Sequence, residues 1–158
     1  NLMKVAIITA STAVYKGEQE DASGKVIRKM VEEAGLDVVF MKALPTDKTV
    51  LSTVFQRMAE GNLADLILTT GGAGCGPEDC TPEATMEVVD RPLLGIPEGM
   101  RAHMLTLTKR AMLNRAAAGI RGKVVIVNLP GKAGAVKECL GYILPEVMHA
   151  VEVAQGIK

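Results

Sequence analysis

Tryptophan is absent from this 158-residue chain, and tyrosine and phenylalanine occur only twice each. Stacking of nucleic-acid bases on aromatic side chains therefore has few platforms. The 18 Lys and Arg residues balance the 18 Asp and Glu residues, and no basic cluster is interleaved with aromatic residues. Because nucleic-acid binding depends mainly on positive charge that meets phosphate, we expect no nucleic-acid partner.

Long apolar runs are also missing. A membrane-spanning helix needs about 20 consecutive apolar residues, and the chain has no such run and no signal-peptide pattern at its N-terminus. The three cysteines, Cys75, Cys80 and Cys139, are odd in number and do not suggest a disulfide framework. We therefore expect reduced thiols, a cytoplasmic location and no membrane partner.

Well-known ligand-binding patterns are likewise absent. Cys75 and Cys80 are five positions apart, but no second Cys or His pair is spaced to complete a zinc site with them. His103 and His149 are isolated within helical patterns, which favours structural roles for both. The glycines that follow Thr70 form neither the phosphate loop of ATPases nor the dinucleotide fingerprint, so a generic Rossmann oxidoreductase is poorly supported.

The chain does contain apolar patterns that alternate between the periods of strands and helices. They predict strands over 4–9, 37–44, 64–70, 116–121 and 123–128, and helices over 23–34, 48–60, 81–89, about 95–114 and 132–154, the last interrupted at Pro145. Such alternation predicts a three-layer α/β/α fold with a mostly parallel, mixed sheet. We expect one domain over residues 3–158, since 48% hydrophobic residues can supply a single sizeable core.

The most informative segment lies between the predicted strand 64–70 and the predicted helix 81–89. It contains four glycines within six residues, Gly71, Gly72, Gly74 and Gly76. A loop with so few side chains lets backbone N–H groups come close to an anion, and the dipole of the following helix favours negative charge there. We expect Thr81 to cap this helix. The alternative is that the glycines only form a tight turn.

Two acids, Glu78 and Asp79, stand within this loop, where carboxylates alone would repel phosphate. Their position indicates a divalent cation between them and the ligand. Further polar groups should share this edge of the sheet, because ligands collect beyond the carboxyl ends of parallel strands. The predicted strand ends there carry Ser11, Asp47 and the segment 128–131. Asp47 also directly precedes a helix, which it could simply cap.

Five segments stand out when the chain is taken as a whole. They are Thr-Thr-Gly-Gly-Ala-Gly at 69–74, Asp-Cys-Thr-Pro-Glu-Ala-Thr at 79–85, Gly-Ile-Pro-Glu-Gly-Met-Arg at 95–101, Met-Leu-Asn-Arg-Ala-Ala-Ala-Gly-Ile-Arg-Gly at 112–122 and Asn-Leu-Pro-Gly at 128–131. Each is weak alone. Together and in this order, they make the chain resemble the MogA/MoaB family of molybdenum-cofactor biosynthesis, from about residue 4 to residue 156.

This resemblance implies a homotrimer that transfers the adenylyl group of Mg-ATP to molybdopterin. In the family's reaction, the terminal phosphate of molybdopterin attacks the α-phosphate of ATP, and pyrophosphate is released. Catalysis is implied for Asp79 and Asp47, and Asp79 would also hold Mg²⁺. The remaining implied residues bind phosphate or nucleotide (Gly71, Gly72, Gly74, Thr70, Thr81 and Ser11) or lie on the molybdopterin side (Asn128, Pro130 and Gly131).

Several positions depart from the family pattern. The family loop usually has Thr and Arg where this chain has Ala73 and Glu78. The family's acid after the proline is replaced by Thr46, so that the nearest carboxylate is Asp47, one residue later. An offset of one extended residue is about 3 Å, enough to impair a reaction that depends on positioning. The alternative function is therefore a molybdopterin- or nucleotide-binding accessory protein of the same fold without transferase activity.

Overall fold

The computed structural model describes residues 2–158 and contains a six-stranded sheet with the order β2-β1-β3-β6-β5-β4. The strands are β1 (Lys4–Ala10), β2 (Asp37–Leu44), β3 (Leu66–Thr70), β4 (Arg91–Pro92), β5 (Ala118–Arg121) and β6 (Val124–Leu129). β1, β2, β3 and β6 run parallel, whereas β5 pairs antiparallel with both β6 and β4. The predicted mostly parallel, mixed sheet is confirmed.

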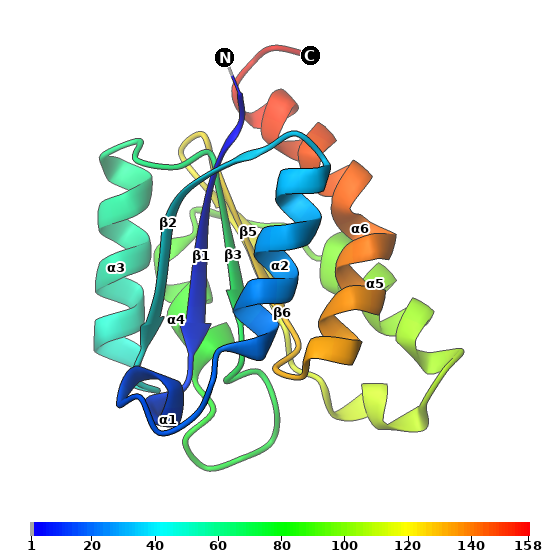
Figure 1. Cartoon of the computed structure of the whole chain (residues 1–158). Coiled ribbons are helices and arrows are strands. Elements are labelled where there is room, and N and C mark those ends of the chain that lie inside the picture. Colours follow the sequence, from blue (N-terminus) through cyan, green and yellow to red (C-terminus); the bar gives the residue numbers. More distant parts are fainter. Residues whose placement is uncertain (1) are drawn as a thin grey trace.

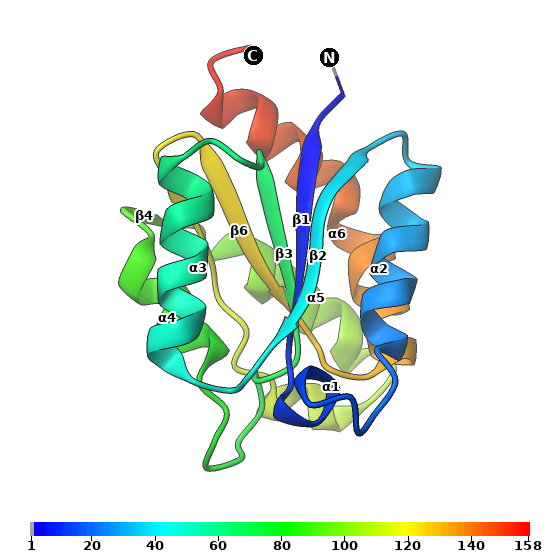
Figure 2. The ribbon, with the colours of Figure 1, turned by 60° about the vertical axis from the view of Figure 1, so that its left-hand side comes forward.

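Helices cover both faces of this sheet. They are α1 (Thr12–Tyr15), α2 (Ala22–Glu33), α3 (Lys48–Glu60), α4 (Thr81–Val88), α5 (Gly95–Leu105) and α6 (Ala133–Ala154), with the 3-10 helix η1 (Lys109–Leu113) after α5. α2, α5 and α6 lie on one face, and α3 and α4 lie on the other (Figures 1 and 2). This is the predicted three-layer α/β/α arrangement. No helix within residues 2–158 is long and apolar enough to cross a membrane.

Each face of the sheet has its own hydrophobic core, because successive strand residues point to opposite sides. In β3, Leu66 and Leu68 belong to the core beneath α2, α5 and α6, whereas Ile67 belongs to the core beneath α3 and α4. Every residue of β3 and β6 is buried. Unbroken burial is typical of parallel strands that are covered on both faces, and it makes these strands a rigid support for the loops that follow them.

The predicted helix over 95–114 is wrong in its extent, since α5 ends at Leu105 and η1 is a separate element. Two threonines explain the break. The Thr106 hydroxyl donates to the His103 carbonyl at 2.7 Å, and the Thr108 hydroxyl accepts from the Arg110 backbone N–H at 3.2 Å. Side-chain bonds of this kind compete with the regular helical pattern.

The predicted interruption at Pro145 is also wrong, because α6 runs without a break through this residue. Proline removes one backbone donor and crowds the carbonyl four positions earlier, which here belongs to Gly141. Buried side chains on both sides of Pro145, including Leu144 and Val147, anchor the helix to the core and offset that cost. Two short elements, α1 and β4, were not predicted.

The carboxyl ends of the four parallel strands emerge at one edge of the sheet, at the bottom of Figure 1. The chain leaves β1 toward β2 on one side, and the next strand, β3, lies on the other side of β1. Crevices form at such switch points of parallel sheets. α1, the loop that follows β3 and η1 surround this edge (Figure 1).

Candidate functional site

The segment from Gly71 to Cys80, called the glycine loop below, begins with two left-handed residues. Gly71 has φ 88° and Gly72 has φ 70°, a conformation that side chains disfavour. A Cβ atom on Gly71 would lie only 2.5 Å from the carbonyl oxygen of Ala10. Glycine is therefore required here so that the end of β3 can pack directly against the end of β1.

Several backbone donors of the glycine loop have no partner within the described part of the protein. The N–H groups of Gly72, Ala73 and Gly74 donate no hydrogen bond to any acceptor within residues 2–158. The tip of the loop, residues 75–78, is exposed. Since α4 begins directly after the loop, the positive end of its dipole faces the same region. Unpaired amides beside a helix start suit an anionic ligand such as phosphate.

Thr81 does not cap α4 as predicted. The cap position belongs to Cys80, which makes no side-chain cap bond, and Thr81 is the first helical residue. The Thr81 hydroxyl is fully buried and donates to the Gly71 carbonyl at 2.9 Å. Its backbone N–H donates to the Gly72 carbonyl at 3.0 Å. Thr81 therefore folds the loop back onto the helix, and its hydroxyl is already engaged within the protein.

Asp79 lies against the inner side of the loop. Its Oδ2 atom accepts from the Gly76 backbone N–H at 2.9 Å. A Cβ atom on Gly74 or on Gly76 would lie 3.0 Å from this same oxygen, so the two glycines make room for the carboxylate. The Oδ1 atom accepts no hydrogen bond within the described part of the chain, which leaves it available to a cation.

Arg115, which lies far from the loop in sequence, holds it in place, and sequence reasoning did not single it out. Its Nε atom donates to the Gly74 carbonyl at 2.6 Å, and Nη2 donates to the Asp79 carbonyl at 3.0 Å. Its backbone N–H donates to the Ala73 carbonyl at 2.8 Å. The guanidinium also binds the Glu83 carboxylate, with distances of 2.7 and 3.3 Å. No local pattern in the sequence links these segments; only the family resemblance drew attention to residues 112–122.

An open hollow of about 570 Å³, the acidic hollow, lies between the tip of the glycine loop and the start of α3. It is lined by Thr12, Thr46, Asp47, Lys48, Thr49, Pro77, Glu78 and Cys80. The Asp47 carboxylate accepts from the Val50 N–H at 3.0 Å and so caps α3, as one of the two alternatives predicted. Because Asp47 also faces the hollow, capping does not remove it from the site.

Negative charge gathers around Cys80. Burial raises the pKa of the Cys80 thiol above its ordinary value, and the carboxylates of Asp47, Glu83 and Asp79 raise it further. No three His, Cys, Asp or Glu side chains among residues 2–158 form a set that could hold a metal ion. Mg²⁺ in phosphate-transfer sites commonly uses one or two carboxylates together with substrate phosphates. Asp47 and Glu78 line the acidic hollow, and Asp79 follows Glu78 in the glycine loop, so an ion here would have to be held by one or two of these carboxylates together with phosphate oxygens of a ligand.

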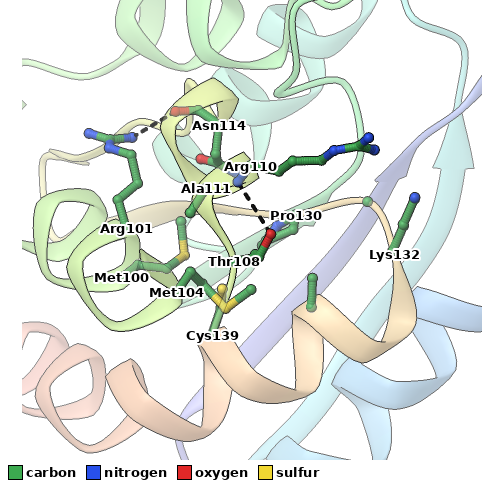
Figure 3. A pocket seen from close by; sticks show the side chains of 12 residues that line it. Met100, Arg101, Met104, Thr108, Arg110, Ala111, Asn114, Pro130, Lys132 and Cys139 are labelled. Carbon is green, nitrogen blue, oxygen red and sulfur yellow. Dashed lines mark hydrogen bonds between the residues drawn. The ribbon is translucent and has the colours of Figure 1, made fainter. Parts of the chain in front are cut away.

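A second cavity of about 340 Å³, the cationic pocket, lies between α5, η1 and the start of α6 (Figure 3). Its walls are mainly apolar and include Met100, Met104, Ala111, Pro130 and Cys139. Burial raises the pKa of the Cys139 thiol to about 11, so this wall is neutral at physiological pH. This part of the pocket therefore suits an apolar or uncharged part of a ligand.

Three cations border this pocket. The Arg101 guanidinium donates to the carbonyls of Ala116 at 3.0 Å and Asn114 at 3.4 Å. The side chains of Arg110 and Lys132 form no ion pair or hydrogen bond inside the described range, and Figure 3 shows both on one side of the pocket. They are free to bind an anionic substituent of the ligand.

A crevice of about 250 Å³ adjoins the cationic pocket, with Gly131 and Lys132 common to both. It lies at the ends of β1, β3 and β6 and includes Ser11, Thr70 and Gly71. The structure thus brings together Ser11, Gly71 and Gly131 from three distant segments, as the sequence predicted. The Thr70 hydroxyl, however, donates to the Pro130 carbonyl and joins β3 to β6.

Asn128 lies away from these hollows. It is fully buried; its Nδ2 atom donates to the hydroxyls of Thr69 at 3.0 Å and Thr85 at 2.8 Å. Its Oδ1 atom accepts from the Ala117 N–H at 3.0 Å. Asn128 therefore links β6 to β3, α4 and the residue before β5, and its side-chain amide is engaged within the protein, so these bonds support a structural role for Asn128 rather than the predicted molybdopterin contact.

Comparisons with known proteins show the family of the chain. Residues 6–149 match the family described as "Probable molybdopterin binding domain". The chain is 34% identical to a molybdopterin adenylyltransferase of Helicobacter pylori, covering 96% of this chain and 88% of that one. It is 38% identical to a molybdopterin adenylyltransferase of Pyrococcus furiosus, covering 96% and 91%. The solved structure of the molybdopterin biosynthesis enzyme MoaB from Thermus thermophilus superposes with a TM-score of 0.92 at 36% identity, covering 98% of each chain.

Proposed function

The chain belongs to the molybdopterin-binding family of molybdenum-cofactor biosynthesis, and we propose that it is a molybdopterin adenylyltransferase. In the proposed reaction, a terminal phosphate oxygen of molybdopterin attacks the α-phosphorus of ATP. The new phosphorus–oxygen bond forms while the bond to the β-phosphate oxygen breaks, and pyrophosphate leaves. Such a transfer needs positioned reactants and neutralised phosphate charge more than it needs covalent chemistry from the protein.

One observation carries this proposal: two hollows of different charge lie at one edge of the sheet, the acidic hollow against the tip of the glycine loop and the cationic pocket beside the segment that follows β6. The acidic hollow contains Asp47 and Glu78, and its lysine, Lys48, is paired with Glu87 at 3.4 Å, whereas the cationic pocket is bordered by Arg110 and Lys132. A nucleotide that arrives with a cation suits the acidic side. A pterin with a free phosphate suits the apolar, cationic side. The unpaired amides of residues 72–74 would then bind phosphate oxygens between the two.

Magnesium enters this proposal as a companion of ATP. Asp79 and Asp47 would hold it, with Glu78 close by at the tip of the glycine loop. When bound, Mg²⁺ would neutralise part of the charge on the phosphates. Asp79 is supported in this role because its Oδ1 atom is unpaired while Oδ2 is fixed by the Gly76 N–H at 2.9 Å.

The decisive experiment is an adenylylation assay with molybdopterin and Mg-ATP. Formation of adenylylated molybdopterin and pyrophosphate in equal amounts is expected. Lys132→Gln should raise the KM for molybdopterin, because it removes a free cation from the cationic pocket. The matched control is Lys123→Gln, which changes a lysine in a hollow at the opposite edge of the sheet and should leave this KM unchanged. No product from a protein that still binds Mg-ATP would overturn the proposal.

A second candidate function rests on Thr46, which stands where the family's acid is usual. Threonine carries no charge, so this position of the acidic hollow lacks a carboxylate. The Thr46 hydroxyl is instead hydrogen-bonded to that of Thr12 at 3.1 Å. If Asp47 does not replace the missing acid, the chain would bind molybdopterin or nucleotide without transferring the adenylyl group. The assay above separates the two functions.

We also propose a homotrimer and a cytoplasmic location. Support for association comes from a hollow of about 430 Å³ between α4 and α5, where Met86 and Leu94 are 44% and 61% exposed. Large exposed apolar side chains grouped in this way are typical of contact surfaces. Light scattering should give three times the chain mass of 16.7 kDa. Three unpaired cysteines are consistent with a reducing compartment.

A further inference from the structure

We infer that the ion pair between Arg115 and Glu83 acts as a clasp that positions the glycine loop for phosphate. Arg115 is a positioning residue in this view. Its guanidinium lies beside the glycine loop, where a phosphate is proposed to bind, but it is already paired with the Glu83 carboxylate. The clasp consists of the bonds from Arg115 to the carbonyls of Gly74 and Asp79 and to the carboxylate of Glu83.

The direction of the loop carbonyls supports this inference. An anion can approach the N–H groups of residues 72–74 only if the carbonyls of the same loop point elsewhere. Arg115 binds the carbonyls of Ala73 and Gly74 from one side through its backbone N–H and its Nε atom. These two oxygens belong to the peptide units that carry the N–H groups of Gly74 and Cys75, so holding them turns those two donors to the opposite side. The Thr81 bonds to the Gly71 and Gly72 carbonyls do the same for the N–H groups of Gly72 and Ala73.

Glu83 fixes the guanidinium in turn. A planar guanidinium that meets a carboxylate with two bonds has one preferred orientation, which a lysine ammonium does not have. Glu83 lies in the first turn of α4, directly after the loop. The clasp therefore ties both ends of the segment 74–83 to one residue that enters from the chain before β5.

The clasp can be tested without any substrate. Glu78 lies at the exposed tip of the loop, so a glutamate-specific protease reports how often the loop opens. Arg115→Lys should speed cleavage after Glu78 about tenfold, since charge-assisted bonds of this kind are worth about that much. Fragments are assigned by mass spectrometry. Glu83→Gln should act in the same direction, and the double variant should add little to Arg115→Lys.

Arg121 offers a matched control. It has a similar exposed fraction, 32% against 37%, and binds the Val88 carbonyl and the Glu60 carboxylate near the opposite edge of the sheet. Arg121→Lys should leave cleavage after Glu78 at the wild-type rate. Unchanged cleavage in Arg115→Lys, or equal acceleration in Arg121→Lys, would overturn the clasp.

The second readout is the affinity for Mg-ATP, and this part rests on the proposed function. Titration calorimetry should give about a tenfold weaker Kd for Arg115→Lys and an unchanged Kd for Arg121→Lys. An opened loop with unchanged affinity would show that the clasp does not serve phosphate binding. If wild type binds no Mg-ATP, the proposed function fails, whereas the protease comparison still decides whether the clasp exists.

Discussion

The Thr81 hydroxyl oxygen lies 2.2 Å from the point that a Cβ atom on Gly72 would occupy. The space beside Gly72 is therefore filled by a buried side chain of the protein and is not open room for a ligand. Gly72 has φ 70°, and the Thr81 hydroxyl donates to the neighbouring Gly71 carbonyl at 2.9 Å. The contact between the two residues joins the start of the glycine loop to the start of α4.

Gly72→Ala should lower the free energy of unfolding by about 3 kcal/mol, because the positive φ and the steric conflict each cost about 1–2 kcal/mol. Thr81→Ala should cost about 1 kcal/mol through the lost hydrogen bond. In the double variant the conflict disappears, so its loss should be smaller than the sum of the two single losses. Urea denaturation measures all three. If the loss in the double variant equals the sum of the two single losses, the contact between Gly72 and Thr81 does not have the effect described.

Asn128→Ala should destabilise the protein by about 3 kcal/mol, measured by urea denaturation. Removal of the side chain leaves the partly buried Ala117 N–H without its acceptor and creates a cavity between β3, β6 and α4. At temperatures where the variant is folded, the KM for molybdopterin should equal that of wild type. A large rise in this KM without a loss of stability would show instead that Asn128 contacts molybdopterin.

Asp79→Asn should reduce adenylyl transfer about a hundredfold, as removal of electrostatic stabilisation from a transfer site typically does. The amide oxygen of asparagine can still accept from the Gly76 N–H, so the loop keeps its shape. The melting temperature should therefore change by less than about 2 °C. Asp79→Ala, the companion variant, should lose both the charge and this bond. If Asp79→Asn lowers the melting temperature strongly and leaves turnover normal, the Asp79 carboxylate serves the fold and not the transfer reaction.

Asp47→Asn should also reduce turnover about a hundredfold, because it removes a carboxylate from the acidic hollow. Asparagine caps helices as well as aspartate does, so the bond to the Val50 N–H and the stability of α3 should persist. Thr46→Asp decides the alternative: if wild type transfers little, this variant should raise the rate by placing an acid after Pro45. Robust wild-type turnover that neither change affects would contradict both accounts.

The stabilising effect of Glu83 should depend on pH. The hydrogen bond from Arg115 holds the pKa of the Glu83 carboxyl below its ordinary value. The stability that ionised Glu83 adds to the folded protein is therefore fully present above 4.5, the pKa of this carboxyl in the unfolded chain. It is lost as the pH falls through the lower pKa that the carboxyl has in the folded protein. Because Glu83 is 49% exposed, solvent limits the contribution to about 0.5 kcal/mol. In urea unfolding, the free energy of wild type should exceed that of Glu83→Gln by this amount at pH 7, and the difference should shrink as the pH falls below 4.5.

Elements with strong local signals could be predicted in full. The range of β2 and that of α3 agree with the structure at both ends, since an apolar run leads into Pro45 and Asp47 starts the helix. The glycine loop and its place at the edge of the sheet were also predictable, because glycines, acids and a strand end lie within 16 residues. The end of α5 and the cap of α4 were predicted wrongly, because each depends on which backbone group a threonine hydroxyl binds, as at Thr106 and Thr81.

The sequence by itself determined the layers, the parallel direction of most strands and the edge where a ligand would bind, because these follow from periodicity and from the direction of the chain. Only the tertiary structure decided what each polar residue does at that edge. Asn128 is the last residue but one of β6, a strand that is buried on both faces, so its sequence position does not reveal whether it points toward ligand or core. Arg115 meets Gly74 across 41 positions of sequence, and a contact of that range exists only after β3, α4 and β5 have packed together.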